Sequence, residues 1–323
     1  MPKIGMDLNR FILEEERKYP SATGSLSIAL MSIETASKII AAHTRMAGLA
    51  DIFGKADKVN IQGEEVQRLD EFSNAVLVRV LSDSGQFYAI ASEEMDDPIY
   101  PEKGVDAKYI VAFDPLDGST NIEVGINVGT IFSIYKRVTG TMYDFMQGGC
   151  RQVAAGYVMY GSSCIFVYTT GSDVNGFTLD PSNGLFLLSH PALKIPQKGS
   201  TYSVNESNSK GWTQKVRDYF DSLKDEAYTA RFIGTMVGDV HRTLLKGGVF
   251  AYPADAKSKK GKLRLLYEVF PMSMITRMAG GMATDGENTL CDIKPTEIHQ
   301  RTPIFLGSTY EVEKFLSMQQ PLL

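Results

Sequence analysis

The run DPLDGST at residues 114–120 carries side chains that could bind a metal ion next to a phosphate group. Its proline and glycine favour a tight turn, so the nearby carboxylates of Asp114 and Asp117 can converge on one side of it. Ser119 and Thr120 then stand where a helix could begin, and a helix N-terminus is a natural seat for phosphate. Hard oxygen ligands suit Mg²⁺ or Mn²⁺. The alternative interpretation is an Asx-type turn with a capping hydroxyl group.

Two further carboxylates, Glu93 and Glu94, close a strand-like run at 87–92. A second strand-like run, 109–113, ends at Asp114. In open α/β sheets ligands bind outside the carboxyl ends of the strands, so acids at two such ends indicate a common site. Adjacent carboxylates repel each other, and a bound cation relieves that repulsion.

Another acid, Asp70, stands in a segment that predicts a helix. Apolar residues recur at helical spacing over 64–81, and Asp70 falls inside their stripe. Burying an unpaired charge is expensive, so Asp70 either has a function or bonds to a neighbouring Lys or Arg. The preceding stretch, 51–63, is rich in glycine and charge, which predicts a mobile loop that closes over the metal site when substrate binds.

The patterns along the chain predict an α/β fold. With 323 residues the chain exceeds the size at which a single core usually stops growing, so we expect two domains. The proline- and glycine-punctuated stretch 181–199 is the predicted boundary, which divides the chain into 1–194 and 195–323. Helices are predicted at 26–47, 64–81, 235–246 and 267–279, and strands at 87–92, 109–113, 128–135 and 154–168.

Composition and charge exclude several classes of partner. The net charge is −5 and no polybasic block is present, so we expect no nucleic acid partner. The three cysteines form no CxxC pair, so neither a disulfide nor a thiolate zinc site is expected. The first residues hold charges in place of an apolar signal core, and no membrane span is expected. The chain does not end in an SKL-type signal. A cytoplasmic protein is the resulting prediction, with organellar import left open.

The motifs together resemble a known family. Segment 113–122, FDPLDGSTNI, closely resembles the metal and phosphate motif of the fructose-1,6-bisphosphatases of the class I, AMP-regulated type. These belong to the metal-dependent, lithium-sensitive sugar and inositol phosphatases. The similarity runs in order from about Arg10 to Leu316, and its other segments are SEE at 92–94, AAGY at 154–157, DVHRT at 239–243 and GKLRLLYE at 261–268. The DPxDG(S/T) core alone would also admit inositol monophosphatases, but the last two segments indicate the narrower family.

The resemblance implies a layered α/β/α/β/α fold with an effector-binding amino-terminal half and a substrate-binding carboxyl-terminal half, assembled as a homotetramer. It implies about two to three Mg²⁺ ions per site, with Mn²⁺ as an alternative. The implied metal ligands are the side chains of Glu93, Asp114, Asp117 and Glu268 and the carbonyl of Leu116, with Glu64 beside a weaker third position. Asp70 and Glu94 would orient and deprotonate the attacking water, which accounts for an acid within an apolar stripe.

For the substrate, the resemblance implies one set of residues that hold the departing 1-phosphate and another set around the rest of the sugar. These residues are Gly118, Ser119, Thr120, Asn205, Arg231, Met236, Tyr252, Lys262 and Arg264. In the family, the arginine at the Arg231 position reaches the neighbouring subunit's site. Asn208 and Phe232 stand where the family commonly has tyrosines that bind the 6-phosphate, so the grip on that phosphate is expected to differ.

An effector site for AMP is also implied. The matching residues are Thr23, Gly24, Leu26, Lys108 and Tyr109, while Ser25 and Lys136 replace a common glutamate and arginine. We expect AMP inhibition of altered strength. The alternative interpretation of Thr23 and Gly24 is a simple helix-entry turn. Redox-regulated plastid relatives carry a cysteine-bearing insertion near 139–150, and this chain has no counterpart, so thiol control is not expected.

The implied activity is Mg²⁺-dependent hydrolysis of fructose 1,6-bisphosphate to fructose 6-phosphate and phosphate in gluconeogenesis. Phosphatases acting on sedoheptulose bisphosphate or on an inositol phosphate are the nearest alternatives. A catalytically silent nucleotide sensor is a third, but such a copy is free to lose carboxylates, and all the implied ligands and both water-activating acids are present. The four histidines do not cluster in the sequence, and each is predicted to be a structural or surface residue.

Overall fold

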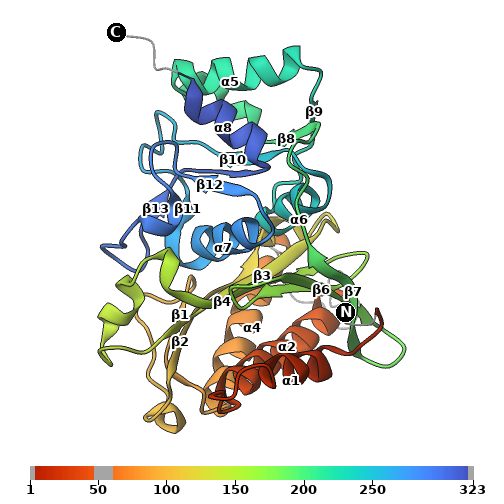
Figure 1. Cartoon of the computed structure of the whole chain (residues 1–323), viewed down its shortest axis with the longest axis vertical. Coiled ribbons are helices and arrows are strands. Elements are labelled where there is room, and N and C mark those ends of the chain that lie inside the picture. Colours follow the sequence, from red (N-terminus) through yellow and green to blue (C-terminus); the bar gives the residue numbers. More distant parts are fainter. Residues whose placement is uncertain (1–3, 47–60, 319–323) are drawn as a thin grey trace.

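The structure is a computed structural model that describes residues 4–46 and 61–318, with side chains from Leu69 onward in the helix that opens the second range. Helices and sheets alternate along the long axis of the molecule (Figure 1). A seven-stranded sheet lies below a five-stranded sheet, with helices outside and between them. This arrangement confirms the predicted layered α/β/α/β/α fold.

The larger sheet holds its strands in chain order, with β1 and β2 parallel and every later pair antiparallel. Its strands are β1 (Phe87–Ser92), β2 (Tyr109–Asp117), β3 (Val128–Lys136), β4 (Gln152–Tyr160), β5 (Ile165–Thr169), β6 (Val174–Asp180) and β7 (Leu185–Leu193). Successive side chains of a strand point to opposite faces. In β2, Ile110 and Ala112 therefore face one apolar core, and Val111 and Phe113 face the other.

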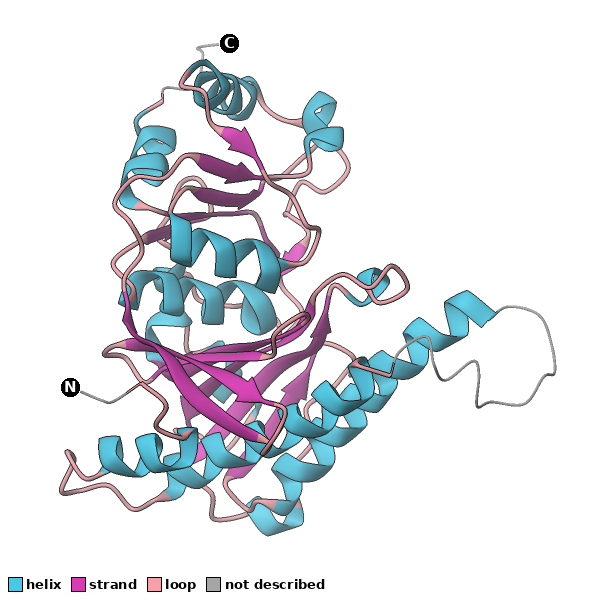
Figure 2. Ribbon diagram, turned by 90° about the vertical axis from the view of Figure 1, so that its right-hand side faces the viewer, coloured by secondary structure: helices cyan, strands magenta, loops and turns pink. Residues whose placement is uncertain are grey.

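The outer face of this sheet is covered by α1 (Leu8–Glu16), α2 (Ser25–Thr44) and α4 (Ile61–Asp83), of which α2 and α4 run side by side (Figure 2). By length and composition alone, α2 could cross a membrane. Half of that helix is buried, however, and its apolar face packs into the core under the sheet. Such burial is typical of the core helix of a globular domain.

The layer between the two sheets consists of α6 (Met236–Lys246) and α7 (Phe270–Met278). The side chain of Thr235 caps α6 by accepting a hydrogen bond from the amide of Gly238. A π-helical turn, η6 (Leu265–Val269), leads directly into α7. Such turns are rare and frequently occur at functional sites.

The smaller sheet has the strand order β12-β14-β10-β8-β9. Its strands are β8 (Thr201–Ser203), β9 (Thr229–Ala230), β10 (Val249–Tyr252), β12 (Met282–Thr284) and β14 (Ile304–Gly307), and its outer helices are α5 (Gln214–Asp225) and α8 (Thr309–Ser317). A two-stranded pair, β11 (Leu263–Arg264) and β13 (Arg301–Thr302), lies beside it. The short 3₁₀ turns are η1 (Glu102–Gly104), η2 (Ser119–Asn121), η3 (Met142–Met146), η4 (Gly149–Arg151), η5 (Glu206–Gly211) and η7 (Leu290–Asp292).

Most predicted elements are present, and several boundaries are corrected. The strand predicted at 109–113 continues to Asp117, because the chain forms a bulge where a turn was expected. The strand predicted at 154–168 is the hairpin of β4 and β5, and the stretch 181–199 contains β7. Of the predicted loop 51–63, residues 51–60 lie outside the described residues and the last three open α4.

A disulfide joins Cys150 of η4 to Cys291 of η7, with Cα atoms 4.7 Å apart and a separation of 141 positions in sequence. Our expectation of no disulfide was therefore wrong. The two turns meet because both pack against α7, a tertiary arrangement that no spacing of cysteines indicates. Cys164 stays free and buried in the outer core.

Candidate active site

A cavity of about 540 Å³ opens between the two halves of the chain. From the amino-terminal half it is lined by the ends of β1 and β2 and by η2, and from the other half by the start of α6, by β10 and β11, and by η6. The predicted site residues that line it are Glu93, Glu94, Asp114, Leu116, Asp117, Gly118, Ser119, Thr120, Asn205, Met236, Tyr252, Lys262 and Glu268. Residues more than 170 positions apart in the sequence thus converge on one cavity. For the acids that follow β1 and end β2, this convergence was predicted from their place at the carboxyl ends of two strands, which are parallel neighbours in the sheet.

Three buried carboxylates form the centre of the cavity. Oxygen atoms of Asp114, Asp117 and Glu268 all lie within 4.8 Å of one another. The amide of Leu116 donates a hydrogen bond to Asp114 at 2.9 Å, and the amide of Val237, in the first turn of α6, donates to Asp117 at 2.8 Å. The bulge of β2 thus points both aspartates to the same place, and the π turn η6 brings Glu268 to them.

Burial and mutual repulsion perturb all three acids. Burial, followed by the charges of Glu93, Asp117 and Glu268, holds the pKa of Asp114 well above its usual range. Burial raises the pKa of Asp117 to about 7, although amide hydrogen bonds oppose the shift. Burial and Glu93 also hold the pKa of Glu268 well above normal. Groups that are costly to ionise, gathered in one cavity and all offering oxygen ligands, fit a hard divalent cation.

Arg264 is the cation that contacts this group within the described residues. Its guanidinium donates to Glu93 at 2.7 Å and its amide donates to Glu268 at 2.6 Å, while Arg264 itself does not line the cavity. One half-buried arginine cannot neutralise four carboxylates. The group therefore keeps an excess of negative charge, which again favours binding of a divalent cation.

Asp70 and Glu94 lie beside the metal-ligand candidates. Burial raises the pKa of Asp70 to about 7, and a hydrogen bond with Ser119 opposes the shift while Glu94 and Glu93 add to it. Partial burial and the charge of Glu93 raise the pKa of Glu94. The acid within the apolar stripe of α4 is thus close to the phosphate-binding turn, as a functional interpretation requires.

In the turn that follows Asp117, the backbone of Gly118 packs closely against the side chain of Thr235. Gly118 has a φ of +75°, and a Cβ atom there would meet the Thr235 side chain at 2.2 Å, so only glycine fits. Ser119 opens η2, and the amide of Asn121 at its end donates to the carbonyl of Gly118. The hydroxyl groups and amides of this turn thus lie at the cavity next to the acids, and Ser119 is hydrogen-bonded to Asp70.

Several lining residues were missed by the sequence analysis: Asn121, Ile233, Gly234, Thr235, Asp239, Phe250 and Leu263. Asp239 belongs to a motif that carried the resemblance, but the motif suggested no role. Conversely, Arg231 was predicted to bind substrate, but it is exposed and does not line this cavity. The side chain of Glu64, another predicted site residue, lies outside the described residues.

Two family models match this chain: "Fructose-1-6-bisphosphatase, N-terminal domain" over residues 6–191 and "Fructose-1-6-bisphosphatase, C-terminal domain" over residues 195–320. The chain belongs to the fructose-1,6-bisphosphatase family. A class 1 fructose-1,6-bisphosphatase of Sulfurihydrogenibium sp. (strain YO3AOP1) is 65% identical over 98% of this chain and 99% of its own. A cytosolic fructose-1,6-bisphosphatase of Oryza sativa subsp. indica is 48% identical over 96% and 94%.

Solved structures of fructose-1,6-bisphosphatases agree with the fold. The holo form of the Leishmania major enzyme superposes with a TM-score of 0.89 at 38% identity, covering 97% of this chain and 98% of the other. The T-state of the same enzyme superposes with a TM-score of 0.88. The layered architecture is thus that of solved fructose-1,6-bisphosphatases.

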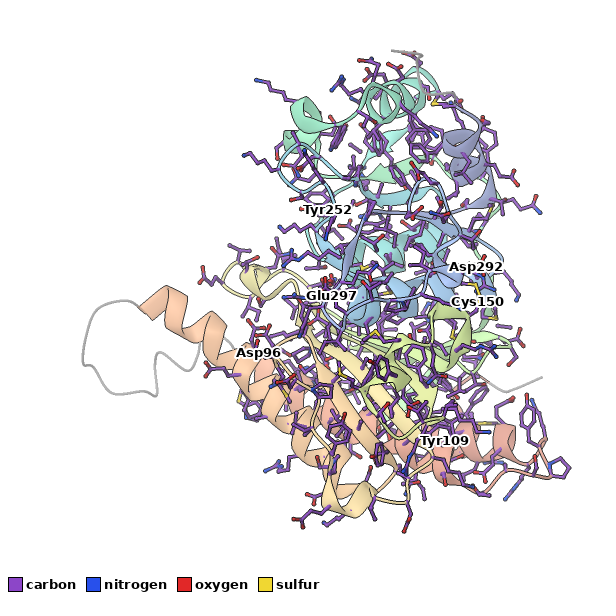
Figure 3. The ribbon with its side chains drawn as sticks, turned by 90° about the vertical axis from the view of Figure 1, so that its left-hand side faces the viewer. Asp96, Tyr109, Cys150, Tyr252, Asp292 and Glu297 are labelled. Carbon is purple, nitrogen blue, oxygen red and sulfur yellow. A yellow bond between two sulfur atoms is a disulfide. The ribbon has the colours of Figure 1, made fainter. Side chains whose placement is uncertain are left out.

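The predicted effector residues lie far from the acids. A pocket of about 290 Å³ at the start of α2 is lined by Thr23, Gly24, Ser25, Leu26 and Tyr109. Figure 3 shows Tyr109 in the half of the molecule opposite to Tyr252, which lines the cavity with the acids. Lys108 donates to the Thr23 hydroxyl at 3.2 Å, whereas Lys136 does not line the pocket and lies opposite Tyr109 on β3.

Proposed function

We propose that the chain removes the 1-phosphate of fructose 1,6-bisphosphate in gluconeogenesis, releasing fructose 6-phosphate and inorganic phosphate, with about two to three Mg²⁺ ions per site. One observation carries this proposal: three buried acids lie within 4.8 Å of one another, next to a turn that lines the cavity with hydroxyl groups and amides. The family is generally dependent on divalent metals. Mn²⁺ has the same oxygen preference and is expected to substitute.

The ions would be held by Glu93, Asp114, Asp117 and Glu268 together with the carbonyl of Leu116, and a weaker position would lie beside Glu64. When bound, they neutralise phosphate oxygens and lower the pKa of a coordinated water. The residues of the chain do the rest. Ser119, Thr120 and the amide of Gly118 hold the 1-phosphate through hydrogen bonds, because η2 turns these donors toward the cavity.

Asp70 and Glu94 act on the attacking water in this proposal. Each can accept a proton while the water oxygen bonds to phosphorus, and the bond from phosphorus to the sugar O1 breaks. A carboxyl group with a pKa of about 7, such as Asp70, suits this role because a general base works best when its pKa lies near the working pH. The proton then leaves with phosphate or passes to the sugar alkoxide.

The rest of the sugar would bind to residues of the carboxyl-terminal half: Asn205, Met236, Tyr252, Lys262 and Arg264. The ammonium of Lys262 lies 5.6 Å from the centre of the Tyr252 ring, and Lys262 adds positive charge to the lining of the cavity. Phe232, 43% exposed at the rim, offers no hydroxyl group to the 6-phosphate.

We also propose that the chain works as a homotetramer in which Arg231 serves the site of a neighbouring subunit. Its exposed side chain and its place outside its own cavity support this. The test mixes Arg231→Ala with Asp114→Asn subunits, each of low activity alone at limiting substrate. Verified hybrids are expected to regain part of the activity, because an intact arginine then serves an intact metal site. Hybrids without recovery would overturn the sharing.

AMP is the proposed effector. Its phosphate would bind the N-terminus of α2, where the amides after Gly24 have no side-chain cap, with Lys108 nearby. Lys108→Ala is expected to raise the AMP concentration for half-inhibition about fivefold without changing uninhibited turnover. Lys103→Ala, an exposed lysine paired with Asp83, is the matched control and should leave AMP inhibition unchanged. Equal inhibition of both variants would contradict the assignment.

We place the protein in the cytoplasm, as for its cytosolic relatives, with an effector and metal half at 1–194 and a substrate half at 195–323. Substrate identity is tested with purified protein, Mg²⁺ and a panel of fructose 1,6-bisphosphate, sedoheptulose 1,7-bisphosphate and inositol 1-phosphate. Preferred phosphate release from fructose 1,6-bisphosphate is expected. Faster phosphate release from another compound of the panel would instead support one of the alternative phosphatase activities. AMP binding without turnover of any of the compounds would support the catalytically silent nucleotide sensor.

A further inference from the structure

Asp239 is a fully buried carboxylate next to the cavity that the proposed chemistry does not use. It lies in the first turn of α6 and accepts hydrogen bonds from the amides of Ile233 and Gly234, each at 3.1 Å. These amides belong to the segment 231–234, which runs along the rim from β9 to α6. A buried acid that bonds to successive amides fixes the conformation of the backbone that carries them.

Arg242, one turn further along α6, adds hydrogen bonds to the same segment. Its guanidinium donates to Asp239 at 2.8 Å and to the carbonyl of Arg231 at 2.5 Å. Among residues 4–46 and 61–318, Arg231 by contrast forms no ion pair, and its side chain is exposed.

Two further contacts tie the segment to the substrate-binding parts of the molecule. The amide of Arg231 donates to the carbonyl of Tyr202 in β8, and the side chain of Asn121 donates to the carbonyl of Ile233 at 3.3 Å. Asn121 closes η2, the turn that carries the phosphate-binding hydroxyl groups. The backbone of 231–234 is thus held at both ends and in the middle, while the side chains of Arg231 and Phe232 remain exposed.

From this arrangement we propose that Asp239, with Arg242, is a positioning residue that sets the direction of Arg231 and so determines the affinity for the phosphate remote from the reaction. The inference rests on the proposed function, because Arg231 is assigned to that phosphate there. A preorganised arginine loses little freedom when it binds, whereas an arginine on a loose segment must be ordered first. Loss of the hydrogen bonds that Asp239 and Arg242 make to the segment 231–234 should therefore weaken substrate binding more than it slows the chemical step.

The test is Asp239→Asn, which keeps the size of the side chain and removes the charge that accepts these bonds. We expect the KM for fructose 1,6-bisphosphate to rise about tenfold while kcat stays within about threefold of wild type. Arg242→Lys, which leaves the buried carboxylate in place, should raise KM by a smaller factor and guards against a failure of the first variant to fold. An unchanged KM in both variants would overturn the proposal.

Asp144→Asn is the matched control. Asp144 is also fully buried and accepts from the amides of Val138, Thr139 and Gly140, but it lies away from the cavity. Its variant should lose comparable thermal stability with no change in KM. If Asp144→Asn raises KM as much as Asp239→Asn does, the effect is general loosening and the proposal fails.

A double-mutant cycle separates positioning from an independent contact. If Asp239 acts through Arg231, Asp239→Asn should raise KM by less than twofold in an Arg231→Ala background, whereas additive effects would contradict the proposal. Amide hydrogen exchange gives a readout without turnover: Ile233 and Gly234 should exchange faster in Asp239→Asn than in Asp144→Asn. Wild-type turnover tests the proposed function, and the ratios of variant to wild type and the exchange rates test this inference, so the two can fail separately.

Discussion

The two faces of the seven-stranded sheet are built from the same strands and bury very different groups. The outer face packs against α1, α2 and α4 through an apolar core. In α2, the buried Glu34 forms an ion pair with Lys38, with 2.7 Å between the carboxylate oxygen and the ammonium nitrogen. The inner face packs against η6, α6 and α7, and the buried groups on or beside it include the acids Asp114, Asp117, Asp239 and Glu268 and the imidazole of His241. Burying such groups costs stability. The acids proposed to act in catalysis therefore belong to the inner face, whereas the core of the outer face is mainly apolar.

The first prediction sets an acid of the inner face against an acid of the outer face. Asp114→Asn should lower kcat by about four orders of magnitude, or about 5.4 kcal/mol in the activation free energy, because a metal ligand is lost. The thermal midpoint should stay the same or rise, since repulsion among the remaining acids falls. Glu34→Gln, the outer-face control, should keep full activity. Steady-state phosphate release and thermal unfolding measure both, and Asp114→Asn activity above a hundredth of wild type would count against the role.

The second prediction concerns the cysteines, which also divide between the faces. The Cys150–Cys291 disulfide fastens η4 and η7 around α7, the helix that follows Glu268, and Figure 3 shows Cys150 beside Asp292 at this junction. Cross-linking residues so far apart restricts the unfolded chain, so Cys150→Ser should lower the free energy of unfolding by about 4 kcal/mol.

The control for this prediction is the buried Cys164 of the outer face. Reductant should lower the thermal midpoint of wild type and of Cys164→Ala, and should have no effect on Cys150→Ser. Denaturant unfolding with and without reductant makes the measurement. A wild-type protein that is equally stable in both conditions, or that carries three free thiols by titration, would show that the cross-link does not stabilise the fold.

The third prediction uses the buried histidine of the inner face. Burial, and to a smaller extent the nearby His190, lowers the pKa of His241 to about 4, and its Nδ1 shares a 2.7 Å hydrogen bond with the Tyr157 hydroxyl group. Because the folded-state pKa lies below the unfolded value of about 6.5, the resulting stability is present above pH 6.5 and is lost as the pH falls toward 4. The loss should amount to about 3 kcal/mol.

The raised pKa values of the acids act in the opposite direction, so the measurement is the difference between wild type and His241→Gln. This difference should shrink by about 3 kcal/mol between pH 7 and pH 4. Parallel pH profiles for wild type and His241→Gln would show that His241 does not titrate with folding.

The sequence revealed the acids of the inner face better than their arrangement. The charge and turn residues of DPLDGST and the doubled acid at Glu93 indicated a metal and phosphate site, because such chemistry depends on residue type and short spacing. The bulge in β2, the π turn that delivers Glu268, and the partners of Asp239 depend on tertiary packing and had no local signal. Strand β7 was not predicted because Pro191 interrupts its pattern. The disulfide was not predicted because its cysteines are 141 positions apart in the sequence.

The central claim is that the acids of the inner face hold a divalent cation on which hydrolysis depends. Phosphate release from fructose 1,6-bisphosphate after exhaustive chelation, and again after Mg²⁺ is restored, tests it most directly. We predict that chelation reduces turnover to background and that Mg²⁺ restores it, because the bare carboxylates otherwise repel an anionic substrate. Full turnover in the chelated protein would contradict the account.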